Sequence, residues 1–351
     1  MPTLDRRNLL AQAACATAAV GATSPGHAQS PRRYRMLLNT AFSGPQAWLL
    51  LAQDSGFLAR EGIELEFTTG AGAFTAAPRL ASGGFDLGYG DINSLIEVAA
   101  KGTGDTPVAV YMMFNASPST IAVKASGPIK TPTDLEGRTL SGHDTDVALR
   151  TFGAFCKTTG TDRSRITITH FDGSMRAQVE GMLKSEKVDG VFGYVSTITA
   201  AMAAAGIDAN TTLRFIKFAE HAPDLYGSAL MASRKMLRDD PQGVAAVVRA
   251  LNQGLAAVLA DQDKAIEAVA RRDPNIRHDI EKLRLVTTLQ VEMSHTEGRS
   301  LGIGDVDDAR LARSIALVAE TNGLPKVPAI RDVFVRDFLP PATDRIRSLA
   351  R

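Results

Sequence analysis

The clearest pattern of hydrophobic and polar positions lies at residues 63–67, where the letters IELEF alternate apolar and charged side chains. A period of two is typical of a strand with one buried face. Small residues at 68–72 end this alternation. Pro78 fits only in the first turn of a helix, so we expect a helix at residues 75–82, beginning just after a turn that contains glycine.

A second unit of the same kind follows directly. Residues 85–89 predict a strand, Gly90 and Asp91 predict a turn, and residues 92–100 repeat apolar side chains at helical spacing. Two strands therefore end in turns from which helices start. In an open α/β sheet, this arrangement places free N–H groups of both helices at the carboxyl edge of the sheet, where small ligands bind.

The alternation of strands and helices continues to about residue 233. Further strands are expected at residues 34–38, 107–114, 120–123, 139–141, 166–170, 188–194, 213–218 and 225–233. Further helices are expected at residues 45–54, 133–135, 147–158 and 175–183, with another that begins near Ser196 and Thr197. The pattern then becomes helical and amphipathic, at residues 241–259, 262–272, 276–293, 306–322 and 330–338. This alternation predicts an α/β fold with mainly parallel sheets.

Two lobes are expected, because the length favours two domains. No linker of low complexity separates them. The economical arrangement inserts a middle lobe into the first by two adjacent crossings. We expect lobe 1 to comprise residues 29–122 with 228–351, and lobe 2 residues 123–227. The crossings are expected near residues 119–125 and 225–232.

The first 28 residues have the pattern of an export signal. Arg6 and Arg7 precede an alanine-rich apolar run, and small residues lead to Ala28. This is typical of a twin-arginine signal peptide, so we expect cleavage after Ala28 and a periplasmic location. The apolar run is shorter than the roughly 20 residues that span a membrane.

Composition changes this picture little. Of the 351 residues, 44% are hydrophobic and 22% charged, as in ordinary soluble proteins. Residues after 28 contain equal numbers of basic and acidic side chains. This balance speaks against nucleic acid or an anionic membrane surface as a partner. Cys156 is the only cysteine after Ala28, so no intramolecular disulfide is expected.

Sequence motifs for catalysis or cofactors are scarce. The six histidines, at positions 27, 143, 170, 221, 278 and 295, form no helical pair four residues apart, so no metal site is expected. The sequence has neither a G-x-S-x-G elbow nor a phosphate loop. Gly70 and Gly72 follow a strand, but the third glycine of a dinucleotide fingerprint is missing. We therefore expect no cofactor and no enzymatic activity.

Four phrases of the sequence, taken together, resemble a known family. They are AQDSGFLAREGIELEF at residues 52–67, LASGGFDLG at 80–88, the set Pro132, Asp134, Leu135, Gly137 and Arg138, and VDGVFGY at 188–194. In this order the chain resembles the substrate-binding proteins of ABC importers, in the group that handles taurine, other sulfonates, nitrate and thiamine pyrimidine precursors. The resemblance covers nearly all of residues 33–340.

This resemblance implies a two-lobed periplasmic binding protein fold of type II. It implies that a small organic solute of sulfonate, amine or heteroaromatic type binds between the lobes, which close about the hinge. The solute would pass to an ABC permease with its ATPase, the only membrane contact, and the protein would be a monomer. Two alternatives stay open: an enzyme of vitamin-precursor metabolism on the same fold, and a ligand-sensing module for a membrane receptor.

One departure from the family pattern leaves the solute open. Many relatives carry a tryptophan near the end of the strand at residues 188–194, but Trp48 is the only tryptophan here. Arginines do not cluster at the predicted turns, and Asp91 either caps a helix, contacts the ligand, or does both. These observations favour a planar or amine-bearing solute over a bare oxyanion.

The expected ligand contacts lie at strand ends and in the following turns. They are Phe42, Ser43, Gly72, Ala73, Phe74, Gly90, Asp91, Asn115, His143, Asp144, Thr145, Ser174, Tyr194 and Tyr226.

Overall fold

The computed structural model describes residues 30–102, 105–185 and 187–349. The expected signal peptide, residues 1–28, lies outside the described residues.

The first sheet has five strands in the order β2-β1-β3-β10-β4. Their bounds are β1 (Arg32–Leu37), β2 (Ile63–Thr68), β3 (Leu87–Asp91), β4 (Val108–Met112) and β10 (Ser228–Ala232). β1 pairs in parallel with β2 and β3, whereas β10 runs antiparallel to β3 and β4. The strand that returns late in the chain therefore lies inside a sheet built from the first strands.

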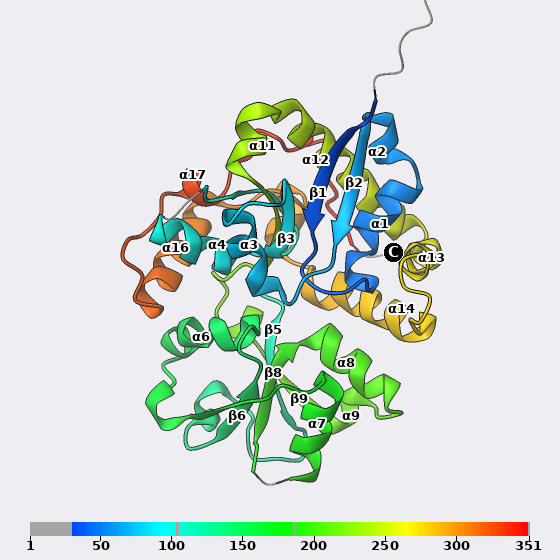
Figure 1. Ribbon diagram of the computed structural model, residues 1–351. Coiled ribbons are helices and arrows are strands. Elements are labelled where there is room, and N and C mark those ends of the chain that lie inside the picture. Colours follow the sequence, from blue (N-terminus) through cyan, green and yellow to red (C-terminus); the bar gives the residue numbers. More distant parts are fainter. Residues whose placement is uncertain (1–29, 103–104, 186, 350–351) are drawn as a thin grey trace, which may run out of the picture. The chain divides into compact units, whose positions relative to one another are not determined.

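The second sheet repeats this plan with the order β7-β6-β8-β5-β9. Its strands are β5 (Ser119–Lys124), β6 (Thr139–Gly142), β7 (Thr167–His170), β8 (Gly190–Tyr194) and β9 (Leu213–Lys217). β5 is antiparallel to β8 and β9, and the remaining pairings are parallel. We refer to the parts built on the two sheets as the first and second lobes (Figure 1). The expected mainly parallel sheets are confirmed. In each sheet, one strand runs in the opposite direction to the other four.

Helices connect the strands and cover the sheets. Those of the first half are α1 (Ala47–Asp54), α2 (Phe57–Arg60), α3 (Ala76–Ala81), α4 (Ile92–Lys101), α5 (Val147–Arg150) and α6 (Phe152–Thr159). Next come α7 (Met175–Lys184), α8 (Val195–Ala204), α9 (Ala209–Thr212), α10 (Phe218–His221), α11 (Arg234–Asp239) and α12 (Pro241–Ala260). The last are α13 (Gln262–Ala270), α14 (His278–Thr287), α15 (Thr296–Leu301), α16 (Asp308–Thr321) and α17 (Ile330–Val333). Short 3-10 turns are η1 (Gly44–Gln46), η2 (Ala73–Thr75), η3 (Pro132–Leu135) and η4 (Arg163–Arg165), and η5 (Thr288–Glu292) is a π-helical turn.

Tertiary pairing corrects several expected boundaries. Gly90 and Asp91 belong to β3 and not to a turn, because both pair with β10, Gly90 opposite Ala229 and Asp91 opposite Ser228. The helix expected near Ser196 begins one residue earlier, and β10 begins at 228 and not at 225.

The crossings between the sheets begin a few residues earlier than expected. The expected boundary between residues 122 and 123 falls inside β5, the whole of which pairs in the second sheet. The chain therefore changes sheet in the segments 113–118 and 218–227, the first just before the expected 119–125 and the second overlapping the expected 225–232.

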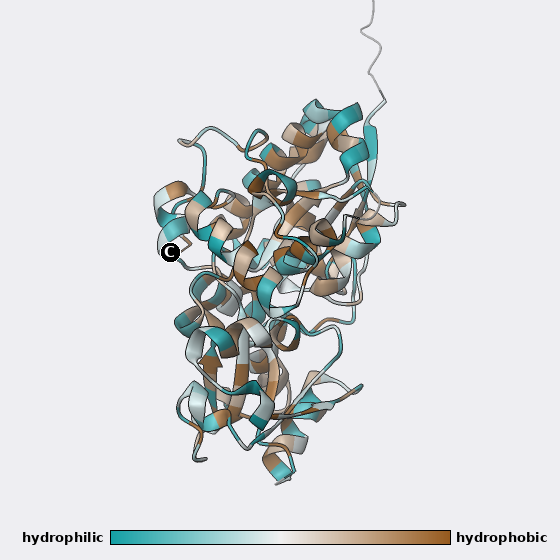
Figure 2. Ribbon diagram, turned by 90° about the vertical axis from the view of Figure 1, so that its left-hand side faces the viewer, coloured by the Kyte–Doolittle hydropathy of each residue, from teal (hydrophilic) through white to brown (hydrophobic). Residues whose placement is uncertain are grey.

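The core of the first lobe forms around Trp48 of α1. This side chain is 1% exposed and stacks on Tyr111, with an edge contact to Tyr89. α12 crosses α1 so closely that a Cβ at Gly254 would lie 2.3 Å from the Trp48 carbonyl oxygen. α12 is apolar enough to span a membrane by composition, but most of it is buried inside the protein. Figure 2 shows hydrophobic segments mainly in the interior and hydrophilic ones at the periphery.

Candidate functional site

A cavity of about 190 Å³ is lined by turns and strand ends of both lobes. The first lobe contributes Asn39, Thr40, Ser43, Pro45, Gln46, Gly72, Ala73, Tyr89, Phe114 and Ser228. The second contributes His143, Thr145, Asp146, Val147, Met175, Gly193, Tyr194, Ser196 and Thr197. Arg284 and Glu292 reach it from α14 and η5. Most of these residues lie where strands end and helices begin, so partly positive helix N-termini surround the space.

The turn after β1 forms a polar wall held by Gln46. The Gln46 amide nitrogen donates to the Asn39 carboxamide oxygen, and to the Thr40 hydroxyl at 2.8 Å. The turn after β2 packs directly on this wall, with Gly72 N–H bonded to the Asn39 carbonyl at 2.8 Å. A Cβ at Gly70 would lie 2.0 Å from the Leu38 carbonyl oxygen. The glycines that end β2 are therefore needed for close approach of two turns.

Gly72 also meets the second lobe. Its φ of 121° suits glycine alone, and a Cβ there would lie 3.2 Å from the Thr145 hydroxyl oxygen. The turns after β2 and β6 thus face each other at one edge of the cavity.

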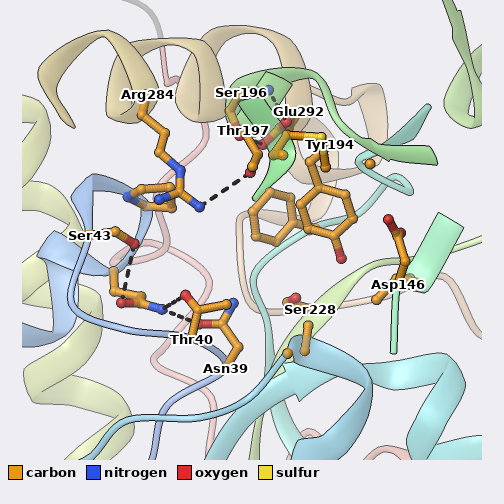
Figure 3. Close-up of a pocket in the computed structure, with 18 of the residues that line it drawn as sticks. Asn39, Thr40, Ser43, Asp146, Tyr194, Ser196, Thr197, Ser228, Arg284 and Glu292 are labelled. Atoms are coloured by element: carbon orange, nitrogen blue, oxygen red, sulfur yellow. Dashed lines mark hydrogen bonds between the residues drawn. The ribbon is translucent and has the colours of Figure 1, made fainter. Parts of the chain in front are cut away.

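Asp146 and Tyr194 form the wall on the second-lobe side. Asp146 caps α5 by accepting the Ala148 N–H at 2.8 Å, and burial raises the pKa of its carboxyl to about 6. The Tyr194 hydroxyl is buried and has no hydrogen-bond partner among the described residues, and the same holds for the Ser228 hydroxyl. Figure 3 shows the Tyr194 hydroxyl pointing into the space between Asp146 and Ser228. Two unpartnered hydroxyls and a carboxyl therefore converge there.

Arg284 supplies a cation on the opposite side of Tyr194 (Figure 3). Its Nη2 donates to the Thr197 hydroxyl at 3.2 Å, while its buried Nε has no partner in the described part of the chain. An unpartnered guanidinium N–H is a donor suited to an anionic group.

Glu292 occupies the start of α8. It accepts the Ser196 N–H at 2.7 Å and the Ser196 hydroxyl at 2.9 Å. Burial raises the pKa of Glu292, and the hydrogen bonds from Ser196 oppose this rise. Because both its oxygens are engaged by α8, this carboxylate is already partnered and offers less to a ligand than Asp146 does.

Of the fourteen residues expected from the sequence, six line the cavity: Ser43, Gly72, Ala73, His143, Thr145 and Tyr194. Eight do not: Phe42, Phe74, Gly90, Asp91, Asn115, Asp144, Ser174 and Tyr226.

Several of these eight have other partners. Asp91 is fully buried and caps α4 through the Asn93 N–H, and burial raises its pKa to about 7. Asn115 and Tyr226 both bond to Glu297, away from the cavity. Asp144 pairs with His170 at the surface, and Ser174 caps α7. The cap that the sequence indicated for Asp91 is confirmed.

The sequence reasoning missed two kinds of lining residue. Asn39 and Thr40 directly follow a predicted strand, so the rule that ligands bind at strand ends could have found them. Arg284 and Glu292 carried no such signal, because charged residues recur throughout the C-terminal helices. The absence of arginines at the predicted turns was misleading, since Arg284 reaches the cavity from a helix distant in sequence.

The cavity offers little for thiol or metal chemistry. Cys156 is buried in a separate hydrophobic cluster, where burial raises the pKa of its thiol to about 12. Within the described ranges, no group of three or more His, Cys, Asp or Glu side chains is placed to hold a metal ion.

Comparison with known proteins places the chain among others of this architecture. A family model described as NMT1/THI5 like matches residues 45–265. No curated protein sequence matches the chain. The structure resembles the periplasmic aliphatic sulphonate binding protein SsuA from Escherichia coli, with a TM-score of 0.67 and 17% identity over 89% of this chain and 94% of that one.

Two other solved structures extend the comparison. The alkanesulfonate-binding protein SsuA from Xanthomonas axonopodis pv. citri, bound to MOPS, has a TM-score of 0.63 and 16% identity over 87% of this chain and 99% of that one. A cysteine-to-serine mutant of DSZB in complex with biphenyl-2-sulfinic acid has a TM-score of 0.58 and 14% identity over 89% and 99%. At such identities the likeness shows the fold, and the expected two-lobed periplasmic binding protein fold is confirmed.

Proposed function

The chain belongs to the NMT1/THI5-like family, and we propose that it is an exported solute-binding protein that captures a small organic molecule for an ABC importer. One observation carries the proposal: turns of both lobes enclose one cavity, and into it project polar groups that have no partner among the described residues. Leaving a buried polar group unpaired costs about 1–3 kcal/mol, so a solute that pairs with such groups is favoured.

The arrangement of these groups supports a solute with two different polar ends. Arg284 would bind an anionic group, such as a sulfonate or carboxylate. Asp146, with the Tyr194 and Ser228 hydroxyls, would accept from an amine or a ring N–H. The apolar faces of Tyr194, Phe114 and Met175 would cover the part between.

An amine-bearing solute is now expected because of Asp146 and not because of Asp91. Asp91 does not line the cavity, and Asp146 takes the role that the sequence suggested for it. Arg284 adds an anionic end to the solute that the sequence alone did not suggest. A bare oxyanion would place a second negative charge beside the Asp146 carboxylate and is disfavoured.

We propose that residues 1–28 direct export by the twin-arginine route, and that the protein acts in the periplasm as a monomer. The bound solute would pass to an ABC permease and its ATPase. Closure would take place about the two segments 113–118 and 218–227, because the solute binds both lobes and favours the state in which they meet. Two of the similar structures are named as SsuA proteins that bind sulfonates, which supports a solute-binding role.

An enzyme on the same fold is the second candidate. The similarity to DSZB, a desulfurization enzyme, favours it, and His143 and Asp146 line the cavity as groups able to transfer protons. The position of Cys156 speaks against thiol chemistry, since that side chain is 3% exposed and lies outside the cavity lining.

Mass spectrometry of the compound that remains bound after gentle purification tests the proposal. We expect a small organic molecule with an anionic group, released unchanged on denaturation. At one hundred times its dissociation constant it should stabilise the folded protein by about 2.7 kcal/mol, which a thermal melt detects. Conversion of the compound into a product with multiple turnover would overturn the transport role in favour of the enzyme. Tight binding of nitrate alone, with no response to amino sulfonates, amino acids or heterocyclic acids, would refute the proposed solute class.

A further inference from the structure

We propose that Glu292 latches the second lobe to the C-terminal helices of the first, so that the walls of the cavity are held together before a solute binds. The inference concerns regulation of the cavity and rests on the proposed function. The latch is carried by residues 278–292, comprising α14 and η5, which we call the strap.

One end of the strap is fixed to the first lobe. The Glu281 carboxylate accepts the N–H of Gly44, the first residue of η1, at 2.6 Å. A Cβ at Gly44 would lie 2.2 Å from the Glu281 carbonyl oxygen, so the two backbones are in close contact. α14 also packs on α13. α14 packs on α8 of the second lobe as well, so the strap lies between the two lobes, and the Glu281–Gly44 contact attaches it to the first.

The other end is bonded to the second lobe. Glu292 is 4% exposed and Ser196 is 1% exposed, and both carboxylate oxygens of Glu292 accept from Ser196. Ser196 lies in the first turn of α8, where unpaired N–H groups and the helix dipole favour a negative charge. Arg284 bonds to Thr197, the next residue of α8.

The π-helical turn aligns these two contacts. In a regular α-helix, residues 284 and 292 would point about 80° apart, because 3.6 residues make one turn. A π turn takes up about one additional residue, which brings the two positions close to the same face. Arg284 and Glu292 consequently both reach the start of α8. The π turn is thus the feature that lets one short strap provide both a cavity residue and a bond between lobes.

Bonding between the lobes before binding has a consequence for affinity. In a binding protein that is mostly open, part of the binding free energy of the solute is used to close the lobes, which lowers the affinity. In a protein whose lobes are already held together, this loss of affinity is smaller. Loss of the Glu292 bonds should therefore shift the unliganded protein toward the open state.

Distance measurement between spin labels tests the latch without any solute. Labels at Glu267→Cys on α13 and Asn210→Cys on α9 use exposed positions, on helices that pack against α14 and α8 respectively. A Cys15→Ser background leaves Cys156, whose burial protects it from labelling. In the absence of solute we expect one short distance for the otherwise unchanged protein. Glu292→Ala should shift the distribution to longer distances, and Ser196→Ala, which removes only the hydroxyl bond, should shift it less.

Gln290→Ala is the matched control, because Gln290 is exposed on the same π turn. It should leave the distances unchanged. The latch is refuted if folded Glu292→Ala gives the distances of the unchanged protein, if Gln290→Ala shifts them equally, or if the unchanged protein already shows the long distance. Should Glu292→Ala fail to fold, Glu292→Met, which keeps the length of the side chain but loses both acceptor oxygens, decides by the same criteria. These distances are measured without solute and do not depend on which solute is found. Failure of the latch can therefore be distinguished from failure of the solute-binding role, which is tested by mass spectrometry.

Discussion

The Arg284 guanidinium donates a hydrogen bond to the Thr197 hydroxyl at 3.2 Å and keeps its buried Nε free of any partner in the described chain. A side chain from a late helix thereby reaches the first turn of α8 and the lining of the cavity. This pairing makes Arg284 the residue on which the proposed anionic end of the solute depends.

Replacing Arg284 by methionine should weaken binding of the co-purified solute by about 10- to 100-fold, because a hydrogen bond to a charged group contributes about 1.5–3 kcal/mol. Isothermal titration calorimetry measures the change. Arg176→Met serves as the control, since Arg176 is an exposed residue of α7 that pairs with Glu180 on the same helix. Equal affinities for the Arg284 variant and the unchanged protein would show that no anionic group lies there.

Asp91 gives the stability a pH dependence of defined sign. Burial raises the pKa of its carboxyl to about 7, and the hydrogen bonds from Asn93 offset this only in part. In the unfolded chain the same carboxyl titrates near pH 4, so between about pH 4 and 7 the folded protein holds the additional proton. The free energy of unfolding contributed by Asp91 therefore falls as the pH rises through this range.

Asp91→Asn tests this pH dependence and keeps an oxygen that can cap α4. Urea unfolding at pH 5.5 and pH 8 should show a smaller difference in the variant than in the unchanged protein. Some dependence of the same sign should persist, because burial also raises the pKa of Asp146 to about 6. Identical pH dependences would show that Asp91 does not titrate in this range.

Gly72→Ala should destabilise the protein and also weaken solute binding. A side chain at a φ of 121° costs about 1–3 kcal/mol. The added Cβ would also press on Thr145 across the cavity edge. Gly83→Ala is the matched control: its φ is 86°, and no atom of the described residues lies within 4 Å of its Cβ position. Chemical unfolding and calorimetry should show strain in both variants but weaker binding only for Gly72→Ala.

Glu297 joins both crossing segments. Its Oε1 accepts from the Asn115 amide and from the Tyr226 hydroxyl, both at 2.9 Å, and its Oε2 accepts from Arg310 at 2.9 Å. Arg310 in turn donates to the Pro223 carbonyl at 2.8 Å. Segments 113–118 and 218–227 thus meet at one buried ion pair, which explains why Asn115 and Tyr226 do not line the cavity.

Glu297→Gln should lower the free energy of unfolding by about 3–5 kcal/mol, because it leaves the buried Arg310 without its charge partner. Urea unfolding measures the loss. Adding Arg310→Met should recover part of it, since the unpaired charge is then removed. A double variant as unstable as the sum of the two single variants would show that the ion pair itself is not the cause.

Local patterns in the sequence account for most of the secondary structure. The alternation at residues 63–67 and the helical spacing at 92–100 correspond to β2 and α4. Both patterns arise from side chains only a few residues apart, so they can be recognised without knowing the fold. Gly72, Thr145 and Tyr194 could be placed at the cavity for a similar reason, since each lies near the end of a predicted strand.

Pairing and packing between segments distant in sequence determined where β3 ends and which late charged residues line the cavity. β3 extends through Asp91 because β10, more than a hundred residues later, pairs beside it. Asp91 is consequently fully buried and does not line the cavity, whereas Asp146 does. Arg284 and Glu292 look like ordinary charges of an amphipathic helix, and only the packing of the strap on η1 and α8 directs them inward. The sequence by itself determined the strands, the helices and part of the cavity wall, because these depend on neighbours along the chain. The tertiary structure alone placed Arg284 and Glu292 at the site, because their positions depend on contacts between helices far apart in sequence.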